Sequence, residues 1–266
     1  MHRVFVTGLL PWIEPPRLLG PGNWSWEGRS ARTELVTHAA ADLTARLNNV
    51  VIGGSAIGLD IQPPLPRPAV RAARTTDAKR RRDTSVGFSR AGARLDAEGK
   101  LSLTPEALAA KLGERFAGRG VVDAGCGAGG NSIGFARAGC RVTAIEHNAA
   151  RLSDARHNAR LYGVEGQIEF VRGDALALLV ARGPSEDVLF LDPPWGADWA
   201  RDGMGVGAFP LLHELLQRRL HTRFSTTVIK LPPSFRVGEI AGARPTAVYG
   251  CAAGDVRRVK FLWVQI

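Results

Sequence analysis

The sequence of 266 residues contains no long hydrophobic run. A membrane-spanning helix needs about 18 or more consecutive apolar residues, so none is expected. The short apolar stretch near the N-terminus is interrupted by Pro11 and Glu14, and no small-residue cleavage site follows it. A signal peptide is therefore not expected either.

Cysteine and clustered histidine are also scarce. The three cysteines, Cys126, Cys140 and Cys251, lack the spacing of metal ligands and leave one thiol over under any pairing. Reduced thiols in the cytosol are the simplest interpretation, so we expect a cytoplasmic protein. The six histidines form no ligand cluster, and no Ser-His-Asp or Cys-His arrangement is evident, so nothing indicates a metal site.

Acidic residues are too few to balance the basic ones, and the net charge is +10. Nine basic residues between positions 67 and 94 stand against Asp77 and Asp83, so this segment supplies +7 of the total. Concentrated positive charge is typical of a polyanion-binding protein. We expect the densest part, Lys79, Arg80, Arg81 and Arg82, to contact RNA phosphates without reading sequence. A solvated charged linker is the alternative.

The chain divides into two regions. Residues 1–83 are rich in proline and predict an irregular α+β extension that ends in a basic linker, with a helix over 33–47, a strand over 57–61 and an extended segment over 63–68. Residues 84–266 are regular. Strands are expected at 121–122, 141–145, 168–171, 188–191, 226–229 and 259–266. Helices are expected at 104–116, with Thr104 as N-cap, and at 131–138, 149–162 and 209–220. This alternation predicts an α/β fold with a doubly wound parallel sheet.

A glycine-rich loop follows the first of these strands. Gly125, Gly127 and Gly129 would let a ligand approach the backbone at the start of a helix. Gly125, Gly127 and Gly130 also satisfy the dinucleotide-binding pattern. Glu146 ends the next strand, where a carboxylate commonly accepts hydrogen bonds from ribose hydroxyls. Adenosyl methionine and NAD both carry such a ribose, so these residues do not separate the two cofactors.

Two further aspartates follow strands. Asp174 could accept a hydrogen bond from an adenine amino group, or it could simply form an Asx turn. Asp123 ends the first strand and could face the amino group of a methionine moiety or orient the glycine loop.

The most informative motif is Asp192, Pro193, Pro194 and Trp195, which ends an apolar run. The two prolines stop the strand at the sheet edge where open α/β folds bind ligands. A carboxylate can accept hydrogen bonds from an exocyclic amine, and an indole can stack on a base. The motif favours methyl transfer to the amino group of a nucleobase. A turn-capping Asp192 and a packed core Trp195 are the structural alternatives, and Trp199 and Phe235 could line the same pocket.

Together these motifs resemble the trimethylguanosine synthase family of guanine-N2 methyltransferases. The similarity runs through residues 88–89, 95–106, 121–131, 155–163 and 193–196. The family usually has Ser in place of Asp192 and Gly in place of Ala197, and Asp-Pro-Pro-aromatic is closer to the broader amino-methyltransferases of ribosomal RNA and DNA.

The resemblance implies a seven-stranded class I (Rossmann-like) methyltransferase sheet, S-adenosylmethionine as methyl donor and stacking of Trp195 on guanine. It also implies that the segment before Thr104 folds over cofactor and substrate. The expected cofactor residues are Asp123, Gly125, Gly127, Asn131, Glu146 and Asp174.

We therefore expect an RNA guanine-N2 methyltransferase. An adenine-N6 methyltransferase on RNA or DNA and an RNA-binding protein that has lost turnover are the alternatives, and a dinucleotide oxidoreductase is the least favoured.

Overall fold

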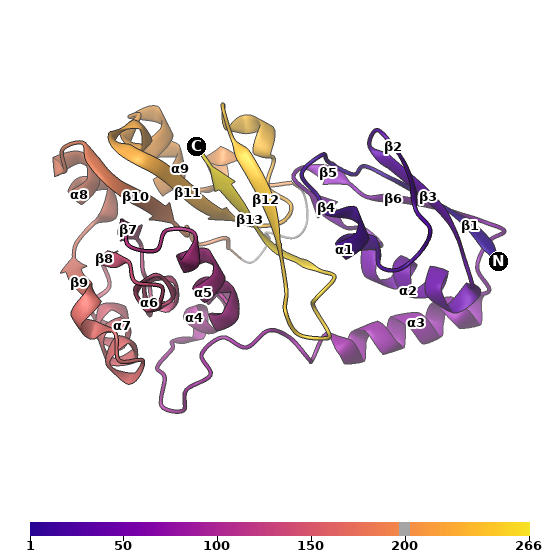
Figure 1. Ribbon diagram of the computed structural model, residues 1–266, viewed down its shortest axis with the longest axis horizontal. Coiled ribbons are helices and arrows are strands. Elements are labelled where there is room, and N and C mark those ends of the chain that lie inside the picture. The colour runs from indigo at the N-terminus through magenta and orange to yellow at the C-terminus, as the bar shows by residue number, and fades with distance from the viewer. Residues whose placement is uncertain (197–202) are drawn as a thin grey trace.

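The computed structural model describes residues 1–196 and 203–266, with the side chains of residues 101 and 186 excepted. Figure 1 shows two parts side by side: an N-terminal part with its own small sheet, and a larger part built on a second sheet. Within the described ranges, no helix has the length and apolar character needed to cross a membrane.

The larger part contains a seven-stranded sheet in the order β12-β13-β11-β10-β7-β8-β9. Neighbouring strands from β11 to β9 pair in parallel, whereas β13 is antiparallel to both β11 and β12. The predicted doubly wound seven-stranded sheet is confirmed, with one antiparallel strand near its edge. The strands are β7 (Gly120–Ala124), β8 (Arg141–Glu146), β9 (Ile168–Arg172), β10 (Ser185–Leu191), β11 (Phe224–Leu231), β12 (Arg244–Tyr249) and β13 (Val259–Gln265).

Alternation along the buried strands divides the apolar side chains between two cores. On β10, Val188 and Phe190 join one core while Leu189 and Leu191 join the other, as expected for a strand buried on both faces. The first core also contains side chains of α5 (Glu106–Glu114), α6 (Gly130–Arg137) and α7 (Ala149–Leu161). The second contains those of α8 (Ala175–Ala181) and α9 (Pro210–Gln217). Helices therefore cover both faces of the sheet.

The N-terminal part is an ordered α+β unit. Its four-stranded antiparallel sheet has the order β2-β3-β1-β6. Val4 and Val6 alternate inward from β1 and share a core with Ala40 and Leu43 of α2. The elements are β1 (His2–Thr7), α1 (Pro15–Leu19), β2 (Ser25–Glu27), β3 (Ser30–Leu35), α2 (Thr37–Leu47), a two-stranded ribbon of β4 (Val51–Ile52) and β5 (Ser55–Ala56), β6 (Gly58–Gln62) and α3 (Arg67–Arg80).

Several local predictions for residues 33–106 were wrong or incomplete. The expected basic linker is largely the helix α3, which begins at Arg67 inside the segment expected to be extended. Residues 33–35 belong to strand β3, so the helix expected from residue 33 begins at Thr37. Thr104 is buried and does not cap a helix, because α5 begins at Glu106 without a side-chain cap. The short helix α4 (Ala97–Ser102), capped by Asp96, was not predicted.

The two parts share one hydrophobic core. Leu9 and Leu18 from the N-terminal part belong to the same cluster as Leu231 and Tyr249 of the larger part. The turn between β12 and β13 also meets the end of α3: an added Cβ on Gly254 would lie 1.9 Å from the backbone oxygen of Arg80. In Figure 1 this turn reaches from the large sheet to the end of α3.

Candidate active site

The glycine-rich loop between β7 and α6 leaves open space beside its backbone. Gly125, Gly127 and Gly129 all have positive φ angles, of 94°, 54° and 87°, which side-chain-bearing residues adopt only with strain. A Cβ added to Gly125 or Gly127 would meet no atom within 4 Å. The loop therefore has room for a ligand at the carboxyl edge of the sheet, where the prediction placed one.

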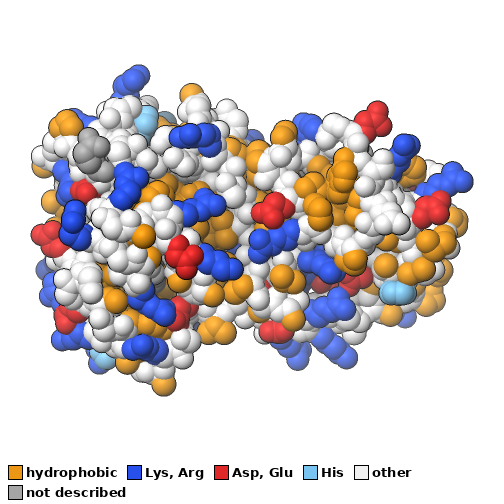
Figure 2. All heavy atoms as spheres, viewed as in Figure 1, with side chains coloured by type: hydrophobic (Ala, Val, Ile, Leu, Met, Phe, Trp, Pro, Cys, Tyr) orange, Lys and Arg blue, Asp and Glu red, His pale blue; other side chains and the backbone are white. Residues whose placement is uncertain are grey.

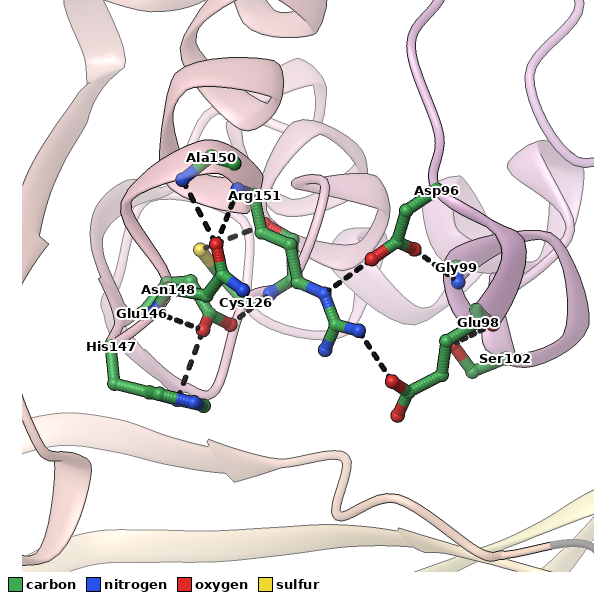
Figure 3. Close-up of polar contacts among 11 residues, drawn as sticks. Asp96, Glu98, Gly99, Ser102, Cys126, Glu146, His147, Asn148, Ala150 and Arg151 are labelled. Carbon is green, nitrogen blue, oxygen red and sulfur yellow. Dashed lines mark hydrogen bonds and ion pairs between the residues drawn. The ribbon is translucent and has the colours of Figure 1, made fainter.

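Glu146 ties this loop to the end of β8. Its Oε2 atom accepts a hydrogen bond from the Gly127 amide at 3.0 Å, and its Oε1 atom accepts one from the Asn148 amide at 2.8 Å. Figure 3 shows Glu146 beside the loop, with His147 at 3.1 Å from Oε1. Each carboxylate oxygen has more than one acceptor position. Binding of ribose hydroxyls by Glu146 stays a prediction.

Helix α4 is held beside the loop by ion pairs. The Arg151 Nε atom of α7 donates to Asp96 at 2.7 Å, and the same guanidinium pairs with Glu98 (Figure 3). The Gly99 amide and then Arg151 lower the pKa of Asp96. From the same segment, Leu103 packs against the start of α6, where an added Cβ on Gly130 would lie 2.4 Å from its Cδ1 atom. The segment before Thr104 thus lies against the glycine loop, and its folding over cofactor and substrate stays a prediction.

The two remaining cofactor aspartates lie in contrasting environments. Asp123 is fully buried; its Oδ2 atom accepts from the Ser132 hydroxyl at 2.6 Å, and no described group donates to Oδ1. Burial, and then the charges of Asp192 and Glu146, raise the pKa of Asp123 to about 7. Asp174 is exposed and caps α8 through the Ala177 amide at 2.8 Å, so the Asx interpretation holds for one of its oxygens.

Asp192 is anchored through one oxygen only. Its Oδ2 atom accepts hydrogen bonds from Lys230 Nζ at 2.6 Å and from Asn131 Nδ2 at 3.0 Å. In the described part of the chain no group donates to Oδ1. Burial is the main influence and raises the pKa of Asp192, while Lys230 and Asn131 act in the opposite direction. The sequence placed Asp192 and Asn131 in different roles, and the structure brings them together.

Lys230 is the functional residue that the sequence analysis missed. It lies on β11, next to β10 in the sheet, and its side chain is 3% exposed. Its Nζ atom also donates to the Ser102 carbonyl at 3.1 Å and lies 5.1 Å from the centroid of the Trp195 ring. A lysine is rarely buried without a partner, so Lys230, directly after the strand predicted at 226–229 and before Leu231, was the available signal. Its partner could not be read from the chain, because Asp192 is 38 residues away.

A cleft of about 770 Å³ opens between the two parts of the molecule. Trp195 and Lys230 line it together with Phe88 and Leu103 of the segment beside the glycine loop. A volume of this order is typical of small-molecule and cofactor sites. Trp195 therefore lines a cleft while it also packs against both cores, and its stacking on a base stays a prediction.

Other predicted substrate residues lie elsewhere. Phe235, which could have lined the pocket, is fully buried, with its ring centroid 5.8 Å from that of Phe209, so it packs in the core instead. Lys79, Arg80, Arg81 and Arg82 are exposed at the end of α3, where Arg80 pairs with Asp42 and Arg81 with Asp77. Trp199 lies outside the described residues.

Comparison with known proteins shows which family the sequence around this site is similar to. Residues 118–205 match the model of the RNA cap guanine-N2 methyltransferase family. The trimethylguanosine synthase of Schizosaccharomyces pombe is 33% identical over 110 residues, which cover 38% of this chain and 46% of the relative. Ribosomal RNA small subunit methyltransferase J of Hydrogenovibrio crunogenus is 39% identical over 83 residues, covering 27% and 30% respectively. The aligned region thus spans less than half the length of either relative.

A solved structure supports the fold. A putative methyltransferase from Porphyromonas gingivalis superimposes with a TM-score of 0.54 at 15% identity, covering 77% of this chain and 51% of that one. The sequence match itself includes the glycine loop, Glu146 and the Asp-Pro-Pro-Trp motif. Over residues 118–205 the chain is therefore similar to the RNA cap guanine-N2 methyltransferase family, and its fold is that of the class I methyltransferases.

Proposed function

We propose that this protein is an RNA methyltransferase that transfers a methyl group from S-adenosylmethionine to the exocyclic N2 amine of guanosine. The observation that carries the proposal is the arrangement of Asp192. One of its oxygens is fixed by Lys230 and Asn131, and the other accepts no hydrogen bond from the described residues, beside a cleft lined by Trp195. The match to the RNA cap guanine-N2 methyltransferase model supports this choice of substrate.

S-adenosylmethionine is the cofactor of class I methyltransferases, and the residues around the glycine loop fit it. The backbone beside Gly125 and Gly127 is open, and the Oδ1 atoms of Asp123 and Asn131 are buried without partners among the described residues. Unpaired buried acceptors of this kind suit a ligand that carries donors. Glu146 would hold the ribose hydroxyls, Asp123 the amino group of the methionine moiety, and Asp174 the adenine. When bound, the cofactor supplies an electrophilic methyl group.

The residues of this site would have to activate a weak nucleophile. The amino nitrogen of guanine is poorly nucleophilic because its lone pair is delocalised into the ring. A hydrogen bond from that amine to Oδ1 of Asp192 strengthens as the nitrogen rehybridises, so it stabilises the transition state more than the ground state. Trp195 would stack on the base and align the amine with the methyl group. Lys230 and Asn131 would keep Asp192 ionised and pointing at the base.

The identity of residue 192 also supports a second candidate function. Asp192 stands where the family usually has Ser, and a carboxylate in this position also suits the N6 amine of adenine. The same geometry therefore supports an adenine-N6 methyltransferase, with a differently shaped base against Trp195.

Labelled methyl transfer into total RNA, followed by nucleoside analysis, tests the proposal. The expected product is N2-methylguanosine, formed at a rate about 100-fold or more lower by Asp192→Ala because the transition-state hydrogen bond is lost. Label in N6-methyladenosine would move the function to the second candidate. Absence of label in any nucleoside would favour an RNA-binding protein without turnover.

A further inference from the structure

We propose that the cleft between the two parts of the molecule binds the phosphates of single-stranded nucleic acid next to the target base. The nucleic-acid partner rests on the proposed function, but the site itself is argued from its lining. Trp195 is on one side, and the end of the β12–β13 turn and the start of β13 contribute Arg257, Arg258 and Lys260 to the other. The cleft thus joins the base-stacking residue to a region of positive charge.

The lining contains only one sign of charge. Among the described residues that line the cleft there is no Asp or Glu, and the basic ones are Arg46, Lys100, Lys230, Arg257, Arg258 and Lys260. Low-dielectric walls of one sign concentrate counter-ions such as phosphates. In Figure 2, Lys and Arg side chains gather in the middle of this face, between the left and right parts of the molecule.

Four of these six cations are engaged by carboxylates behind the walls. Arg46 pairs with Asp42, Lys230 with Asp192, Arg258 with Asp77 and Lys260 with Asp255. These ion pairs stabilise the walls of the cleft, and the aspartates partly neutralise the charge of the four basic side chains.

Arg257 and Lys100 differ from these four. No carboxylate pairs with either residue within the described ranges. Lys100 is exposed on α4, beside the glycine loop, and Arg257 is on the β12–β13 turn. The Arg257 guanidinium rests on Gly20, where an added Cβ would lie 3.0 Å from Nη1, so the N-terminal part supports it. These two cations are the ones available to an anionic ligand.

The size of the cleft limits its ligand to an unpaired strand. A volume of about 770 Å³ is within the range of pockets for single small ligands, about 300–1,000 Å³. A paired base would have its amine directed into the duplex, so it must leave the helix before its amine can reach Asp192. The ligand is therefore one or two unpaired nucleotides with their phosphates.

The cleft continues into the basic end of α3. Thr84 and Ser85 line it, and only Asp83 separates them from the Lys79–Arg82 run. Ser85 donates to Asp255 at 2.9 Å, which fastens this connection to the β12–β13 turn. A strand leaving the cleft in this direction would pass over the residues that the sequence analysis assigned to phosphate contacts.

The test compares the double variant Arg257→Ala/Lys100→Ala with the matched control Lys111→Ala/Arg141→Ala, which removes two exposed charges away from the cleft. Binding of a fluorescent single-stranded RNA oligonucleotide is measured by anisotropy across a salt series. The cleft variant should bind about tenfold more weakly, with a slope of log K against log salt flatter by about 1.4, which is 0.7 for each lost phosphate contact. The control should bind like the wild type.

Three further measurements make the outcome decisive. Affinity for adenosyl homocysteine should be unchanged in the cleft variant, which also reports an intact fold. Arg257→Lys/Lys100→Arg should restore most RNA binding, and a fully paired duplex should compete poorly. Equal weakening in both double variants, or wild-type binding by the cleft variant, overturns the proposal. RNA that binds through the cleft but is never methylated would leave this site standing and remove the proposed function.

Discussion

A buried lysine sets the state of the carboxylate at the centre of the site. Burial raises the pKa of Asp192 and so favours the protonated form, in which a proton on Oδ1 would take the place of the proposed hydrogen bond from the amine. Lys230 opposes this effect at 2.6 Å and is itself 3% exposed. Removal of either partner leaves an unpaired buried charge, so the pair acts as a unit.

Lys230→Met should therefore raise the pKa of Asp192 further. Because Asp192 works as the ionised form, activity is present above its pKa and is lost as the pH falls through it. The acid limb of kcat should move to higher pH, with kcat at mildly acid pH about tenfold or more below wild type, since an opposite charge typically shifts a carboxyl by one or more pKa units. A pH profile of kcat checks this.

Lys230→Arg is the matched control, because it retains the charge and should restore the acid limb. A Lys230→Met enzyme that loses activity equally at every pH would show that Lys230 only supports the fold.

Asp123 makes a separate prediction about the cofactor. Its pKa is raised to about 7, so its favourable contribution to stability is present at acid pH and is lost as the pH rises through about 7. If Asp123 pairs with the ammonium group of the cofactor, it must ionise on binding. Adenosyl homocysteine should then bind about tenfold more tightly at pH 8 than at pH 6, with release of a proton below pH 7.

Calorimetry in two buffers of different ionisation enthalpy measures that proton directly. Asp123→Asn should abolish both the proton release and the pH dependence. Affinity that is independent of pH in the wild type would limit Asp123 to orienting the glycine loop through Ser132.

The contact between α5 and α6 depends on glycine at the helix crossing. An added Cβ on Gly134 would lie 2.6 Å from the backbone carbonyl carbon of Ala109, and one on Gly113 would lie 2.6 Å from the Gly134 oxygen. The obstacles are backbone atoms, which cannot rotate away. This close approach brings α5 against the helix that follows the glycine loop.

Gly134→Ala should lower the free energy of unfolding by about 2 kcal/mol. The helix propensity gained, about 1 kcal/mol, is outweighed by the overpacking. Gly166→Ala is the control, because an added Cβ there meets nothing within 4 Å and should change stability by less than about 1 kcal/mol in either direction. Urea denaturation of both variants measures the difference, and a neutral Gly134→Ala would show that the two helices can separate without cost.

Most strands of the large sheet were predictable because they contain apolar runs, some of which end at glycine or proline as in residues 188–193, but β12 was not predicted. Secondary-structure predictions from local sequence patterns were wrong where contacts between distant residues determine the structure. Residues 33–35 fit a helical pattern with those that follow, but Thr33 pairs with Val4 in a sheet. The basic segment was predicted to be a linker, but most of it forms helix α3. Asp77 of this helix is buried and forms ion pairs with Arg81 and Arg258.

The cleft belongs to the molecule as a whole, and no single stretch of sequence indicates it. Its walls meet because Asp77 and Arg258, 181 residues apart, form an ion pair, and because Ser85 bonds to Asp255. The shared core of the two parts fixes this arrangement. The sequence predicted Asp192 and Trp195, the residues that the proposed function places against the base. It did not predict the lysine behind them or the cleft that leads to them.

Methyl transfer to two matched single-stranded oligonucleotides, one with guanosine and one with inosine at every guanosine position, tests the central claim most directly. Inosine lacks only the N2 amino group, so base stacking on Trp195 and the phosphate contacts are preserved. We predict incorporation into the guanosine oligonucleotide, recovered as N2-methylguanosine, and none into its inosine counterpart. Equal incorporation into both, or incorporation only when adenosine is present, would contradict the assignment of Asp192 to the guanine N2 amine.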